Sequence, residues 1–181
     1  MNRRTAIRNC FFVTAGVALI PSCMQNNDGG KPSQVYNKIP ITAKHELMMA
    51  ELADTIIPGG ETPGAKEVDA HLFSLVMVND CFSPDEQQQF LKGMDEFEAL
   101  CKQSFSKNFT ALNETQRKSI LEKVVTMSSD KNNAAVQFYQ KSKGLILQGF
   151  TNSKYYMTKV RVYEMVPGRF HGCVPVKSVK A

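Results

Sequence analysis

Residues 83–105, SPDEQQQFLKGMDEFEALCKQSF, combine a helix start signal with a long apolar stripe. Ser83 is a favourable N-cap, Pro84 suits the first helical position, and Glu86 stands three residues after the cap, as in a capping box. The residues that recur at helical spacing are Phe90, Met94, Phe97 and Cys101. The stretch therefore predicts one long amphipathic helix that runs to about Phe105 and turns its apolar stripe toward a core.

Similar signals on both sides of this stretch predict further helices. Thr42 as N-cap and Pro58-Gly59-Gly60 as a stop enclose one helix, Asn113 opens a second capping box, and residues 133–150 fit another helix. The predicted buried faces are Met49, Leu52, Ala53 and Ile56; Val68, Leu72, Leu75, Val76 and Asn79; Ile120, Leu121, Val124 and Met127; and Tyr139, Ile146 and Phe150. We expect an all-α protein, a compact bundle of about five helices.

The chain changes character from Thr151 onward. Residues 151–153 break the helical pattern, residues 160–164 alternate with a period of two, and prolines follow at positions 167 and 175. This tail predicts an irregular or extended C-terminal arm that wraps the bundle.

The N-terminus has the pattern of an export signal. Arg3, Arg4 and Arg8 precede an apolar run over residues 10–20, and small Ser22 stands directly before Cys23. At about 1.5 Å per residue the run would cross only about half of a hydrocarbon core roughly 30 Å thick. We expect residues 1–22 to be a removed signal peptide, either of the twin-arginine kind or an ordinary lipoprotein signal, and Cys23 to be lipidated.

This interpretation sets the domain organisation and the location of the mature protein. Residues 23–40 are polar and rich in turn formers, as in a flexible tether, and residues 41–181 form one helical domain. The expected location is the periplasmic side of the cell envelope, with a lipid anchor in the membrane. Because Arg3, Arg4 and Arg8 are the only charges in the signal, its removal lowers the net charge from +5 to +2, which argues against nucleic acid as a partner.

The cysteines that remain offer a disulfide rather than a metal site. Cys81, Cys101 and Cys173 lack the spacing of a zinc site or of covalent haem attachment. Cys81 and Cys101 should lie too far apart on successive antiparallel helices, so the expected pair is Cys81 with Cys173.

The histidines leave an alternative function open. Glu67 and His71 stand one helical turn apart, which suits a metal site or a general acid-base pair but also an ordinary surface pair. His171 could join them in a stand-alone lipoprotein with a metal-binding or catalytic role. The motifs themselves assign no catalytic, cofactor-binding or metal-binding residue.

Several stretches resemble the small subunit, subunit 3, of gluconate 2-dehydrogenase. They are residues 51–58 (ELADTIIP), 61–65 (ETPGA), 149–150 (GF), 155–156 (YY) and 166–173 (VPGRFHGC). The resemblance implies a non-catalytic accessory subunit of a membrane-associated dehydrogenase for sugars or sugar acids. Its partner would be a flavoprotein of the glucose-methanol-choline type that carries FAD, while this chain would hold no cofactor.

The resemblance also gives the export signal a role. A flavoprotein folds around FAD in the cytoplasm, so a partner with a twin-arginine signal could escort it across the membrane and then tether it. Many relatives lack a lipidation cysteine, so Cys23 suggests a lipid anchor in place of a membrane cytochrome. Whether a cytochrome c subunit belongs to the complex stays open.

Two segments are candidate partner interfaces. The residues concerned are Pro58, Gly59, Gly60, Thr62, Pro63 and Gly64 in the first loop, and Arg169 and Phe170 in the arm. Proline lowers the cost of ordering a loop, and glycine allows close backbone approach. The loop could equally be a helix connection with a demanding backbone, and Phe170 could fill the chain's own core.

Overall fold

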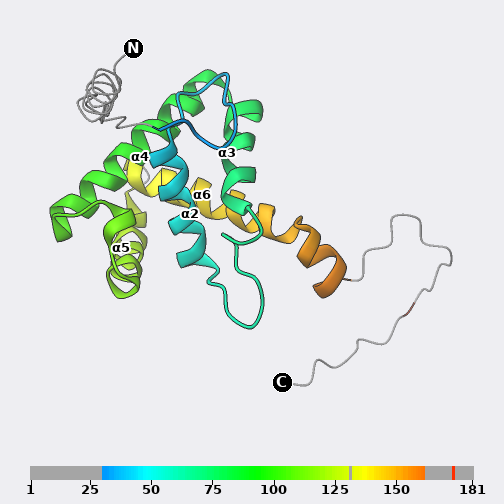
Figure 1. Cartoon of the computed structure of the whole chain (residues 1–181). Helices are drawn as coiled ribbons and strands as arrows, with labels where there is room; N and C mark the ends of the chain where they lie inside the picture. The colour runs from blue at the N-terminus through cyan, green and yellow to red at the C-terminus, as the bar shows by residue number, and fades with distance from the viewer. Residues whose placement is uncertain (1–29, 131, 162–172, 174–181) are drawn as a thin grey trace, which may run out of the picture.

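The computed structural model describes residues 30–130, 132–161 and 173 (Figure 1). Over these residues the chain forms five α-helices and no strand, which confirms the all-α prediction. The α-helices are α2 (Ala43–Ile56), α3 (Ala70–Cys81), α4 (Pro84–Phe105), α5 (Glu114–Thr126) and α6 (Ala134–Thr151). The short turns are the 3-10 helices η1 (Phe109–Ala111) and η2 (Met127–Ser129) and the π-helix η3 (Tyr156–Val160).

Local capping fixes the starts of three helices as predicted. Thr42, Ser83 and Asn113 each accept a hydrogen bond from the third residue of the helix that follows, and that residue's side chain accepts one in return. The reciprocal residues are His45, Glu86 and Gln116. Each box satisfies two N–H groups that a helix end leaves unpaired.

Helix α6 is the centre of the bundle and contacts the other four α-helices (Figure 1). Its closest neighbour is α4, and the crossing is tight because a Cβ on Gly93 would lie only 2.5 Å from the Ala134 carbonyl oxygen. The Phe138 ring packs 5.0 Å from that of Phe90 and 5.6 Å from that of Phe97, centroid to centroid. An aromatic cluster between these two helices is thus one part of a core to which all five α-helices contribute.

The start of α3 differs from the sequence prediction. Helix α3 begins at Ala70, so Val68 precedes it, and Leu72 and Val76 are only half-buried. The residues that α3 buries are Ala70, His71, Ser74, Leu75, Val78 and Asn79. The predicted buried face of α3 was therefore wrong by part of a turn. The helix begins where the preceding loop ends and not at a capping side chain, because the N-cap residue Asp69 has φ +57° and makes no cap hydrogen bond.

The tail also differs from the extended structure expected after Thr151. Residues 156–160 form the π-turn η3, in which the Arg161 N–H donates to the Tyr156 carbonyl at 2.8 Å. The Tyr156 ring packs 5.8 Å from that of Phe150, so an aromatic contact holds the segment against the end of α6. The prediction of an arm beyond residue 161 lies outside the described residues, as do Arg3, Arg4, Cys23, Arg169, Phe170 and His171.

Within the part of the chain that the structure describes, no helix combines the length and apolarity that a membrane span requires.

Candidate functional site

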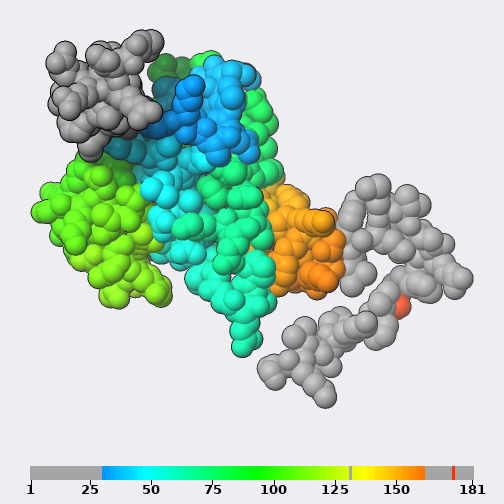
Figure 2. Space-filling view, in the orientation of Figure 1, coloured from blue at the N-terminus to red at the C-terminus, as the bar shows by residue number. Residues whose placement is uncertain are grey.

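The connection between α2 and α3 is a closed loop that projects at the lower edge of the molecule in Figures 1 and 2. Its neck is tied by the Ala65 N–H, which donates to the Ile57 carbonyl at 2.9 Å, and its tip by the Gly60 N–H, which donates to the Thr62 carbonyl at 3.0 Å. Residues 58–62 are exposed. The loop therefore holds its shape through its own backbone and offers its tip to solvent.

Gly64 explains why the neck needs glycine. It is buried, and a Cβ there would lie 2.4 Å from the Gly59 nitrogen and 2.6 Å from the Ile57 carbonyl oxygen. Its N–H donates to the Glu67 carboxylate at 2.7 Å. Gly64 thus serves the fold of the loop, whereas Gly60 at the tip has no atom within 4 Å of its Cβ position.

A half-buried charge cluster fastens the loop to the bundle. The Glu51 carboxylate on α2 accepts from Lys66 Nζ at 2.7 Å and pairs with the guanidinium of Arg117 on α5. The side chains of Glu51 and Arg117 are only 15% and 14% exposed. Arg117 also donates to the Thr110 carbonyl at 3.0 Å and lies over the Phe109 ring.

Electrostatics favour the charged form of Glu51. Burial alone would raise the pKa of its carboxyl, but the hydrogen bonds and positive charges of Lys66 and Arg117 outweigh burial and hold that pKa below its usual value. The carboxylate is therefore a permanent anchor for two elements rather than a proton donor at neutral pH.

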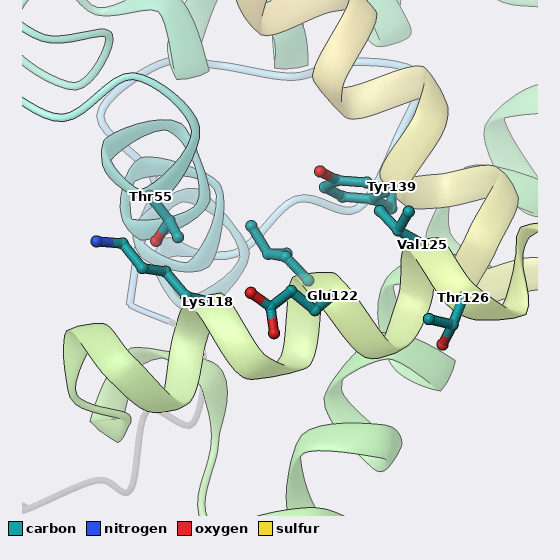
Figure 3. Close-up of a pocket in the computed structure, with 7 residues that line it drawn as sticks. Thr55, Lys118, Glu122, Val125, Thr126 and Tyr139 are labelled. Atoms are coloured by element: carbon teal, nitrogen blue, oxygen red, sulfur yellow. The ribbon is translucent and has the colours of Figure 1, made fainter.

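A two-part groove runs beside the loop, between α2 and α5. Its apolar part, a hollow of about 410 Å³, is bordered by Thr55 of α2, Leu121 and Val125 of α5 and Tyr139 of α6 (Figure 3). Its polar part, of about 450 Å³, is lined by Asp54, Thr55, Pro58, Gly59, Glu114, Arg117 and Lys118. The two parts share Thr55 and Lys118, and the polar part reaches the loop. We call residues 58–62 and this groove the loop-groove surface.

The predicted loop residues divide between two roles. Pro58, Gly59, Gly60 and Thr62 are exposed on the loop-groove surface, whereas Pro63 is half-buried and Gly64 is buried. The neck is thus a helix connection whose backbone leaves no room for a side chain at Gly64, which is one of the two predicted interpretations. The tip is exposed and can contact a partner. Whether it does so stays a prediction.

The alternative site built on Glu67 and His71 finds little support in the described residues. Glu67 precedes α3 and its carboxylate accepts the Gly64 N–H, so the two residues are not one turn apart on a helix. His71 is 8% exposed, its Nδ1 has no hydrogen-bond partner, and burial lowers its pKa. No group of three or more potential metal ligands occurs in residues 30–130, 132–161 and 173.

The three cysteines that the structure describes are free thiols. Cys81 and Cys173 are exposed, and Cys101 is buried, where desolvation raises the pKa of its thiol to about 12. The predicted pair between Cys81 and Cys173 is not formed here. Because the neighbours of Cys173 lie outside the described residues, the pairing stays a prediction.

The fold and the loop-groove surface together define a small all-α protein whose most distinctive described feature is an ordered surface loop. Comparison with models of protein families identifies the family to which it belongs. The model for gluconate 2-dehydrogenase subunit 3 matches residues 43–168, and the chain belongs to that family. The match spans all five described α-helices and confirms the family that the sequence resembles. No curated protein and no solved structure matches the chain.

Proposed function

We propose that this chain is the non-catalytic small subunit of a membrane-associated, FAD-dependent dehydrogenase for sugars or sugar acids. In this proposal it escorts, tethers and stabilises a flavoprotein subunit of the glucose-methanol-choline type, which carries FAD and removes hydride from the substrate. Family membership supports the role of a subunit. The observation that carries the proposal is the loop-groove surface, which lies entirely within the family match.

The physical properties of this surface suit docking. The loop tip is held by hydrogen bonds before any partner arrives, so binding would not have to order it. Val125 is 50% exposed beside the buried ring of Tyr139, which gives the groove an apolar floor, and Lys118 and Glu122 supply charges at its edge. An apolar centre with a polar rim is the usual anatomy of an interface.

The envelope location belongs to the same proposal. A signal over residues 1–22, with Arg3 and Arg4, would deliver the folded complex, and lipid on Cys23 would hold it through a tether over residues 23–40. Residues 30–40 rest on the bundle, where the Ser33 N–H donates to the Glu46 carboxylate and Ile39 is buried, so the free part of the tether would be residues 23–29. At about 5 to 6 Å times the square root of its length, that part has an r.m.s. length of roughly 15 Å. A cytochrome c subunit would be a further partner if the complex passes electrons to one.

The first experiment probes the loop tip. A glucose-methanol-choline type flavoprotein encoded beside this chain is produced with it, and their affinity is measured. We expect Gly60→Arg to weaken binding at least tenfold without changing the unfolding temperature, because a side chain at that position meets no neighbour within 4 Å. Gly144→Arg on α6, where the Cβ position is equally open, is the matched control and should bind as the parent does.

A second pair probes the groove. Val125→Asp places a charge on its apolar part and should also weaken binding, whereas Val35→Asp changes another exposed valine and should not. Unaltered affinity in both Gly60→Arg and Val125→Asp would refute docking at this surface. Stoichiometric metal, with activity that is lost in His71→Ala, in the chain purified alone would instead favour the stand-alone enzyme.

A further inference from the structure

The positive charge of this chain is concentrated in one segment. Residues 131–163 contain six lysines and arginines and no aspartate or glutamate, although the whole chain has an excess of only five positive charges. Charge of one sign over so long a stretch is unusual for a solvated face, where opposite charges alternate. The segment includes α6 and η3. Its uniform positive charge favours a binding partner of negative charge.

The exposed cations of this segment lie on the second half of α6 and on the residues that follow it. Lys143, Lys154, Lys159 and Arg161 are exposed, and none pairs with a carboxylate among the described residues. By contrast, Lys141 lies 3.9 Å from the Glu86 carboxylate and over the Phe82 ring. The last turns of α6 and η3, orange in Figures 1 and 2, project from the rest of the bundle. We call residues 143–161 the basic end.

Apolar and aromatic side chains accompany these cations. Leu147 is 40% exposed and stands one helical turn after Lys143, while Val160 is 55% exposed between Lys159 and Arg161. Tyr155 and Tyr156 are half-buried in the same projection. Lysine and arginine next to exposed aliphatic residues and tyrosine is the composition of segments that lie at a membrane interface.

We propose that the basic end rests on a bilayer surface rich in anionic lipid. Lipid headgroups would pair with the four cations, and Val160 and Leu147 would reach the boundary with the acyl chains. A lipid surface fits better than an acidic protein because the basic end projects outward and carries apolar groups among its charges. The proposal goes beyond the proposed function and requires neither lipid on Cys23 nor a flavoprotein.

The expected effect is large enough to measure. Each basic residue near an anionic surface strengthens binding roughly fivefold, so three together contribute about a hundredfold at moderate salt. The attraction is screened by salt and should fall steeply as ionic strength rises.

The test measures binding of the full chain to vesicles. Every protein carries Cys23→Ser, so that no lipid is attached, and is titrated with phosphatidylcholine vesicles with or without 30% phosphatidylglycerol. We expect the parent to prefer the anionic vesicles and the triple variant Lys143→Gln, Lys154→Gln, Lys159→Gln to lose about a hundredfold of that preference. The leader carries Arg3, Arg4 and Arg8 and can itself favour anionic vesicles, but all variants share it, so the difference between variants reports the basic end.

A matched triple variant separates location from net charge. Lys92→Gln, Lys102→Gln and Lys107→Gln change three exposed lysines on and just after α4 and remove the same total charge. This control should keep most of the parent's preference. An equal loss in both triple variants, or no preference for anionic vesicles in the parent, would overturn the proposal. So would a basic-end variant that binds vesicles normally but no longer binds the flavoprotein, since the surface would then belong to a protein partner.

Discussion

Gly60 and Gly64 lie in one loop but differ in what their missing side chains permit. A methyl group on Gly64 would overlap the backbone of residues 57–59, which cannot withdraw without opening the neck. We expect Gly64→Ala to lower the free energy of unfolding by about 3 kcal/mol, the upper range for overpacking. Gly60→Ala should change it by less than about 0.5 kcal/mol. Urea unfolding of both variants checks this, and equal midpoints would mean that the neck is not closed as described.

His71 makes stability depend on pH. Burial lowers the pKa of its imidazole below the ordinary 6.5, with Asp69 and Glu46 opposing that shift and Lys66 adding to it. The unfolded chain therefore takes up a proton near pH 6.5, whereas the folded chain does so only at lower pH. The contribution of His71 to the free energy of unfolding is fully present above pH 6.5. It falls as the pH drops below 6.5, by at most about 1.4 kcal/mol per pH unit for one proton.

The corresponding measurement is urea unfolding of the parent and of His71→Gln between pH 7.5 and 5.5. The variant should lose less stability over this interval than the parent. Because burial also lowers the pKa of His45, His45→Gln is a useful comparison that should remove a separate part of the slope. Identical slopes in the parent and in His71→Gln would show that His71 does not titrate with unfolding.

Among the elements, the Glu51 cluster joins α2, the loop and α5. We expect Glu51→Gln to cost about 2 to 4 kcal/mol, because the largely buried guanidinium of Arg117 would lose its carboxylate. Lys92→Gln breaks the exposed pair of Lys92 with Glu96 on α4, at 3.8 Å, and should cost less than about 0.5 kcal/mol. Thermal unfolding distinguishes the two, and a cost for Glu51→Gln no greater than the control would argue that the cluster does not hold the loop.

Which elements were predictable follows from the range of the interactions that fix them. Ser83 and Glu86 are three residues apart, so their capping box is legible in the sequence, and α4 has the predicted bounds. The ion pair between Glu51 and Arg117 joins residues 66 positions apart in the sequence, so no local sequence pattern predicts it. The groove likewise exists only where α2, α5 and α6 meet.

The two elements that differed from prediction also depend on tertiary contacts. The start of α3 is set by the loop neck, where the Ala70 N–H donates to the Ala65 carbonyl at 3.0 Å, and not by a capping side chain. At η3 the packing of Tyr156 on Phe150 gives residues 156–160 a helical turn, whereas most of the alternating stretch at 160–164 lies outside the described residues. Short periodic signals are weak evidence where an aromatic side chain can reach a packed helix.

In the molecule as a whole, the two proposed contact surfaces face different directions. The loop projects downward in Figure 1, whereas the basic end projects to one side. A flavoprotein at the loop-groove surface and a bilayer at the basic end could therefore be bound together. Such a domain would orient its partner at the membrane, while a lipid on Cys23 would set only the maximum distance.

The escort role predicts that export of two chains depends on two residues of one. Replacing Arg3 and Arg4 by lysines keeps the charge and the apolar run, so an ordinary secretion signal would still function, whereas the twin-arginine pathway requires the arginine pair. We expect the double variant to leave both this chain and the flavoprotein in the cytoplasm, measured by fractionation and immunoblotting of each, and Arg8→Lys to export both. Envelope delivery of the flavoprotein with the double variant would rule out co-transport. Delivery of this chain alone, with its partner left in the cytoplasm, would show that the two chains are not exported as a complex. The export signal over residues 1–22 would then direct only the chain that carries it.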